Sequence, residues 1–166
     1  MMLKIEYRKV SDLIPYANNA RKHPQKQLQK LASNIKNLGF LVPALIDKQN
    51  VILTGYARVE AAKIAGLSEI PTIPIEHLSE AQKRAFILAD NRLSQDSSWD
   101  LEKLKIELVF LNEYEFELGL TAFETPEIDI LLGDEDPASS AEDDIEIIPP
   151  DYQAVSQLGD VWELGN

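Results

Sequence analysis

The residues of this chain best suited to binding chemistry are a glycine and an arginine at a predicted strand-to-helix turn. The apolar run Val51–Thr54 is followed by Gly55 and Arg58, which open an alanine-rich segment that ends at Gly66. Free backbone N–H groups at a helix start, reinforced by the helix dipole, bind phosphate or carboxylate. Gly55 lets the backbone approach an anion closely, and Arg58 can add a bidentate, charge-assisted contact. The pattern predicts an anion site, and an ordinary turn with a surface arginine is the alternative.

The charges of this chain are distributed unevenly, which bears on the partner that it binds. Residues 1–100 contain 14 Lys and Arg against 10 Asp and Glu, whereas residues 101–166 contain 2 against 18, so +4 and −16 give the net charge of −12. No acid lies between Asp12 and Asp47, an interval that holds Arg21, Lys22, Lys26, Lys30 and Lys36. A basic front and an acidic back indicate an anionic partner for one part of the chain. A solvated helix face is the alternative interpretation.

Composition excludes several classes of function. The chain has no cysteine, which removes disulfides, thiolate metal sites and cysteine nucleophiles. His23 and His77 lack the spacing of metal ligands, so no metal site is expected. No apolar stretch approaches the roughly 18 residues that a membrane span needs, and the first ten residues show no secretory signal. We therefore expect a soluble, cytoplasmic protein.

The elements that must position these residues follow from hydrophobic periodicity and turn signals. The expected strands are Ile5–Tyr7, Val42–Ile46, Val51–Thr54 and Ile70–Ile75, of which the second and third form a hairpin. The prolines of Ile70–Ile75 favour an edge position, because proline cannot donate to a ladder. The expected helices are Gln25–Leu38, the alanine-rich segment after Gly55, Ser79 to about Ala89, Leu101–Asn112 and Pro126–Leu132. We expect an α/β (α+β) domain with a small mixed or antiparallel sheet.

Several spaced motifs connect the turn to the rest of the chain. In order they are Leu13-Ile14-Pro15, Asn19-Ala20-Arg21-Lys22, Gly39-Phe40, Pro43 and the turn at Gly55–Arg58. This ordered set resembles the ParB/sulfiredoxin superfamily over about residues 5–95. The run Gly55–Gly66 is similar to the sequence GHGRLLAAKxLG in the methylase-associated branch of this superfamily. Asp90-Asn91-Arg92 is similar to the DNR segment of the same branch. Gly159–Asn166 resembles the GDLWxLGxH segment that opens the methyltransferase domain in such fusion proteins.

Departures from the family pattern limit the activity that the resemblance implies. The partition proteins carry a box like GERRxRA that holds CTP, and Tyr56, Ala57 and Glu60 do not match it. CTP hydrolysis is therefore not implied for this chain. Sulfiredoxins need a catalytic cysteine in the turn, so the absence of cysteine excludes their activity.

The resemblance implies a domain organisation as well as a fold. It implies a ParB-like domain over residues 1–95 with a small mixed sheet and surrounding helices, followed by a helical extension over 96–133. An acidic flexible linker is expected over 134–154, because its composition cannot bury enough apolar surface to order itself. Residues 155–166 are expected to begin a truncated downstream methyltransferase domain.

The function implied is binding of a nucleotide or DNA phosphate that positions or regulates an attached bacterial or phage DNA methyltransferase. The expected phosphate or nucleotide site is Thr54, Gly55, Tyr56, Ala57, Arg58 and Arg21. The expected DNA-backbone contacts are Lys22, Lys26, Lys30 and Lys36. Asp90, Asn91 and Arg92 either border the pocket or cap a helix end, and Tyr56 either stacks on a base or packs against the hairpin.

The implied cofactor is a nucleotide with Mg²⁺, whereas S-adenosylmethionine would bind only in the missing domain. The expected partners are DNA or nucleotide and the methyltransferase domain, without a membrane, and a homodimer is compatible with them. This chain is not expected to be catalytic by itself. The alternatives are a stand-alone nuclease, NTPase or small-molecule kinase using carboxylates such as Glu6 or Asp90, and an acidic protein-interaction module.

Overall fold

The structure, a computed structural model, describes residues 3–133 of the chain. The chain divides into two units, Met1–Leu132 and Gly133–Asn166, and the account below concerns the first of them. The predicted acidic linker and the predicted start of a downstream domain lie outside the described residues.

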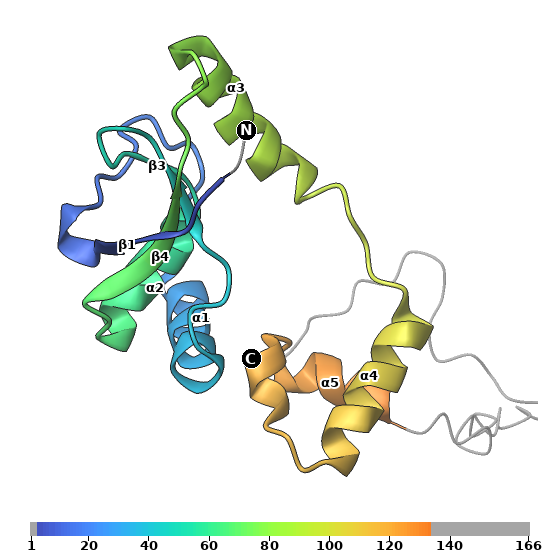
Figure 1. The fold of residues 1–166 in the computed structure, drawn as a ribbon. Helices are drawn as coiled ribbons and strands as arrows, with labels where there is room; N and C mark the ends of the chain where they lie inside the picture. Colours follow the sequence, from blue (N-terminus) through green and yellow to red (C-terminus); the bar gives the residue numbers. More distant parts are fainter. Residues whose placement is uncertain (1–2, 134–166) are drawn as a thin grey trace, which may run out of the picture. The chain divides into compact units, whose positions relative to one another are not determined.

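Within the described part, the centre of the fold is a four-stranded mixed sheet with the order β1-β4-β2-β3 (Figure 1). Its strands are β1 (Glu6–Lys9), β2 (Ala44–Ile46), β3 (Ile52–Thr54) and β4 (Glu69–Pro74). β4 runs antiparallel to β1 and parallel to β2, and β2 and β3 form the antiparallel hairpin. The predicted small mixed sheet and the α+β class are confirmed.

The prediction of an edge position for Ile70–Ile75 is wrong, because β4 lies between β1 and β2. Pro71 is opposite Tyr7 of β1, but pairing with β2 begins only at Thr72. Pro74 is opposite Ile46 of β2, but pairing with β1 ends at Thr72. Each proline therefore has a neighbouring strand on one side only, which is locally the situation of an edge strand.

Helices cover the two faces of the sheet. α2 (Tyr56–Ala65) and the short helix η1 (Val10–Asp12) contribute to a buried cluster with the strands; its members are Val10, Leu13, Ala44, Ile46, Ile52, Val59, Ala62 and Ile70. α1 (Gln25–Leu38) packs on α2 through Ala32, Ile35 and Ala61. A separate cluster of Leu53, Ile75 and Ile87 buries one side of α3 (Glu80–Leu93) against β3 and the end of β4.

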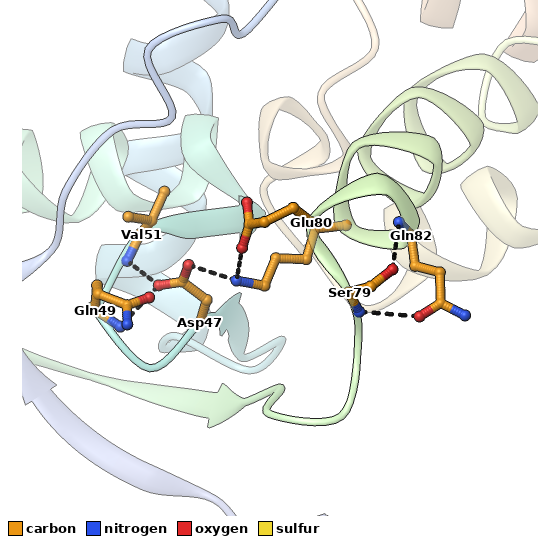
Figure 2. Close-up of polar contacts among 7 residues, drawn as sticks. Asp47, Gln49, Val51, Ser79, Glu80 and Gln82 are labelled. Carbon is orange, nitrogen blue, oxygen red and sulfur yellow. Dashed lines mark hydrogen bonds and ion pairs between the residues drawn. The ribbon is translucent and has the colours of Figure 1, made fainter.

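α3 begins as predicted but continues further. Ser79 accepts a hydrogen bond from the Gln82 N–H and the Gln82 side chain accepts one from the Ser79 N–H, so the two residues form a capping box at the helix start (Figure 2). The helix ends at Leu93 rather than near Ala89. Asp90-Asn91-Arg92 therefore lies in the last turn of α3, and the predicted end near Ala89 is too early.

The extension after α3 consists of α4 (Leu101–Glu113), η2 (Leu118–Thr121) and α5 (Thr125–Leu132). Asp100 caps α4 by accepting a hydrogen bond from the Lys103 N–H. The buried residues of the extension are Leu104, Leu108, Leu120 and Ile128. Among the described helices, none combines the length and the apolar character that crossing a membrane would require.

Candidate functional site

The strand-to-helix turn has the geometry that the sequence predicts. Thr54 ends β3, and Gly55 precedes α2 with φ 89° and ψ 17°, in the left-handed region. No side chain caps this helix start within the described structure. A Cβ at Gly55 would lie 2.9 Å from Arg58 Nη2 and 3.4 Å from Ala44 Cα. Glycine therefore suits the left-handed backbone conformation, and a larger residue would displace the Arg58 guanidinium.

A pocket of about 840 Å³ opens in front of this turn. Its walls come from the segment before α1, from α1, from the β3–α2 turn and from α3. The residues predicted to form the site that line it are Arg21, Thr54, Gly55, Tyr56, Ala57, Arg58, Asp90 and Asn91. The whole predicted phosphate set is thus brought to one cavity, together with two residues of the Asp90–Arg92 segment.

Arg58 is the most unusual side chain of the pocket. Its Nε is buried and has no hydrogen-bond partner among the described residues. Burial lowers the pKa of Arg58, and the nearby charge of Asp90 opposes this effect. An arginine stays protonated in proteins, so the pocket holds a partly desolvated positive charge. An anionic ligand could supply the missing acceptor.

Arg21 connects the segment before α1 to the end of α3. Its Nη1 donates to Asn91 Oδ1 at 3.2 Å and to Ser94 Oγ at 2.9 Å. Asn91 in turn donates from Nδ2 to the Ile87 carbonyl oxygen at 2.9 Å. Arg92 differs from its neighbours, because its side chain is 71% exposed and pairs with Asp96 at 3.1 Å rather than lining the pocket.

Tyr56 and His23 form an aromatic border of the pocket. Their ring centroids are 6.0 Å apart with a 32° angle between the planes, and His23 Nδ1 lies 3.0 Å from Gln27 Oε1. Tyr56 also packs against the buried cluster under α2. His23 and Gln27 were not predicted as pocket residues, and the position of His23 two residues after Arg21 is the signal that could have suggested it.

The predicted DNA-contacting lysines lie outside the pocket lining. Lys22 and Lys36 are exposed, whereas Lys26 and Lys30 each form an ion pair with Glu124, at 2.9 and 2.7 Å. The hydrogen bond from Lys30 and, to a smaller extent, the one from Lys26 lower the pKa of Glu124. The sequence offered no sign of this pairing, because the partners are more than 90 residues apart.

A second buried polar group fixes the start of α3 to the β2–β3 turn (Figure 2). Asp47 Oδ1 accepts hydrogen bonds from the N–H groups of Gln49 and Val51, both at 2.9 Å, and Oδ2 accepts from Lys83 Nζ at 3.0 Å. Burial alone would raise the pKa of Asp47, but these hydrogen bonds together lower it. Lys83 also donates to Glu80 at 2.7 Å, and the two carboxylates raise the pKa of Lys83.

The carboxylates considered for a stand-alone enzyme are not grouped. Glu6 of β1 forms an ion pair with Arg8, whereas Asp90 of α3 lies near Arg58 of α2. Across residues 3–133, no three His, Cys, Asp or Glu side chains are placed to hold a metal ion together.

Fold and pocket define a small α+β domain with a pocket at a strand-to-helix turn that two arginines line. The chain belongs to the ParB N-terminal domain family, whose model matches residues 3–92, more than half of the sequence. The ParB-methyltransferase HTH domain matches residues 102–158. The family resemblance predicted from the motifs is confirmed, including its methyltransferase-associated type. The match of residues 102–158 to a helix-turn-helix family model was not predicted.

Individual relatives agree with this assignment. The chain is 40% identical over 82 residues to the ParB-like nuclease domain-containing protein YnaK of Escherichia coli, covering 49% of this chain and 94% of that protein. It is 35% identical over 98 residues to Stage 0 sporulation protein J of Bacillus subtilis, covering 57% of this chain but only 34% of that protein.

A solved structure shares the fold. The C-terminally truncated chromosome-partitioning protein ParB from Caulobacter crescentus, complexed with CTP-γ-S, superposes with a TM-score of 0.61 at 20% identity. The match covers 72% of this chain and 69% of the Caulobacter chain.

Proposed function

We propose that this domain binds the phosphate groups of a nucleotide in the pocket between Arg21 and Arg58, and that it serves as the binding module of a DNA methyltransferase. The observation that carries the proposal is the buried Arg58 Nε without a partner, beside a helix start that no side chain caps in the described structure. A buried donor without an acceptor costs free energy, roughly 1–3 kcal/mol. A phosphate oxygen would remove that cost.

The size and walls of the pocket fit a mononucleotide. A volume of about 840 Å³ lies within the usual range for small-molecule sites, roughly 300–1,000 Å³. Phosphates would lie at the Gly55 turn, where the N–H groups of α2 and the helix dipole favour negative charge. The base would lie toward Tyr56 and His23, whose rings can stack on it.

The family supports a nucleotide as the ligand. The Caulobacter ParB of the same fold was crystallised with CTP-γ-S. In this chain Tyr56 and Ala57 occupy positions that are acidic and basic in the box of the partition proteins, and we propose binding without hydrolysis. Mg²⁺ would enter with the nucleotide, and Asp90 is the one carboxylate among the pocket-lining residues of the described part.

Attachment to a methyltransferase is supported by the match of residues 102–158 to the ParB-methyltransferase HTH domain. In such a protein the pocket and the predicted DNA-contacting lysines would hold nucleotide and DNA phosphates while another domain transfers the methyl group. Contacts to phosphates fix position and do not read sequence, so target choice would lie elsewhere in the protein.

Calorimetric titration with CTP, ATP and GTP, each with and without Mg²⁺, tests the nucleotide site. Arg58→Ala should weaken binding about 10- to 150-fold, which corresponds to roughly 1.5–3 kcal/mol for a hydrogen bond to a charged group. Arg84→Ala removes an exposed arginine of α3 that does not line the pocket and is the matched control. Equal affinities for wild type and Arg58→Ala would show that the ligand does not bind at this turn.

A further inference from the structure

One carboxylate oxygen of the extension holds two lysines of α1. Glu124 Oε1 accepts from Lys26 Nζ at 2.9 Å and from Lys30 Nζ at 2.7 Å. The two lysines are four residues apart on α1 and therefore lie on the same side of the helix. A phosphate oxygen accepts hydrogen bonds from lysines in the same way as this carboxylate does.

Two backbone carbonyls of the extension also accept hydrogen bonds from side chains of α1. Lys30 Nζ also donates to the Ala122 oxygen at 2.9 Å, and Asn34 Nδ2 donates to the Leu120 oxygen at 2.9 Å. Lys26, Lys30 and Asn34 follow one another at four-residue intervals, and we name them the polar strip of α1. Its contacts with the extension are ionic or hydrogen-bonded, and such contacts weaken when salt or a competing anion is present.

The extension itself carries negative charge. Residues 101–133 contain 8 Asp and Glu against 2 Lys, a net charge of −6. While the extension contacts the polar strip, the Glu124 carboxylate lies beside the two lysines, and the negative charge of the extension opposes the approach of a DNA backbone. A phosphate bound to the same two lysines would lie beside the Glu124 carboxylate, and like charges at such short distances repel each other. Glu124 and DNA phosphates therefore compete for this side of α1.

We propose that the polar strip of α1 is a shared surface, occupied by Glu124 when DNA is absent and by DNA phosphates when DNA is bound. The extension then restrains DNA binding, and DNA releases the extension from α1. The inference rests on the proposed contact of α1 with DNA and adds its regulation.

Binding of the full chain to a fluorescein-labelled duplex of mixed sequence, followed by anisotropy between 50 and 200 mM KCl, tests this competition. Glu124→Gln should bind DNA more tightly than wild type. Its slope of log affinity against log salt should match that of wild type, because both proteins place the same two lysines on DNA. The double variant Lys26→Ala, Lys30→Ala should instead have a slope flatter by about 1.8, because each neutralised phosphate contributes roughly 0.9 to the slope. Glu113→Gln, at an exposed position of α4, removes the same charge away from the polar strip and is the control for net charge.

A double variant and hydrogen exchange distinguish a failure of the competition from a failure of the proposed DNA contact. If the double variant Lys26→Ala, Lys30→Ala loses DNA affinity while Glu124→Gln matches Glu113→Gln, the competition is refuted but the DNA-binding face stands. If the double variant binds DNA as well as wild type does, the proposed role of α1 is refuted together with the competition. Hydrogen exchange adds a direct readout: DNA should speed exchange over residues 118–122, and protection there would also refute the competition. Thermal melting checks that each variant folds.

Discussion

Replacing Gly55 by alanine tests the central geometry of the site, and Gly66 provides a control of the same backbone type. Both glycines belong to the ends of α2 and have positive φ, 89° at Gly55 and 82° at Gly66. An alanine in the left-handed region costs roughly 1–2 kcal/mol. A Cβ at Gly66 meets no atom within 4 Å, whereas at Gly55 it would lie 2.9 Å from Arg58 Nη2.

These distances separate an effect on stability from an effect on binding. Both variants should lose about 1–2 kcal/mol of unfolding free energy, because the guanidinium tip is flexible and can move away at Gly55. Only Gly55→Ala should lose anion binding, because the new methyl group displaces Arg58 and covers the approach to the N–H groups of α2. We expect its nucleotide affinity to fall at least about tenfold, as for one charged hydrogen bond.

Urea denaturation measures the first effect and calorimetric titration the second. The reasoning is refuted if Gly55→Ala and Gly66→Ala have equal nucleotide affinity. A Gly55→Ala variant that is far less stable than Gly66→Ala would show instead that Ala44, at 3.4 Å, limits the space rather than Arg58.

Three further predictions concern the groups around α3. Asp47→Ala should destabilise the domain by roughly 1–3 kcal/mol, because buried donors lose their acceptor; in urea denaturation, Glu80→Ala should cost much less, since the Glu80 side chain is 78% exposed. The folded pKa of Asp47 lies below its ordinary value of 3.8, so its stabilisation is present above pH 3.8 and disappears as the pH falls through the lower folded value. Acid unfolding curves should show this dependence for wild type, and Asp47→Asn should lose it. Arg21→Ala should weaken nucleotide binding and speed hydrogen exchange at the end of α3, because Asn91 loses its partner from the segment before α1; unchanged exchange would contradict that role.

Local sequence signals were sufficient for the parts of the fold that neighbouring residues determine. The Gly55 turn, the β2–β3 hairpin and the Ser79 capping box depend on residues a few positions apart, and each is present. The first helix was also predicted with its observed bounds, Gln25–Leu38. Its buried side was not specified by the sequence, because Leu38 is 43% exposed whereas Ala32 is buried against Ala61.

The features that sequence reasoning missed depend on residues distant in the chain. β4 is central because β1 pairs with its first part and β2 with its last part. No pattern within Glu69–Pro74 indicates these two partners. The burial of Arg58 and its nearness to Asp90 require α3 to fold over β3. The pairing of Lys26 and Lys30 with Glu124 likewise arises only when the extension contacts α1.

The net charge of −12 does not oppose an anion site, because the charges that matter are local. At physiological salt, exposed charges more than about 8 Å apart are largely screened, whereas the buried Arg58 Nε is screened much less. α3 is held in place at both ends, which determines the charges that it presents to the pocket. Its first turn is fixed by the hydrogen bond from Lys83 to Asp47, and its end is fixed by the hydrogen bond from Arg21 to Asn91. With both ends held, α3 presents one carboxylate, Asp90, to a pocket that contains two arginines. The pocket therefore retains a positive charge that a phosphate can neutralise.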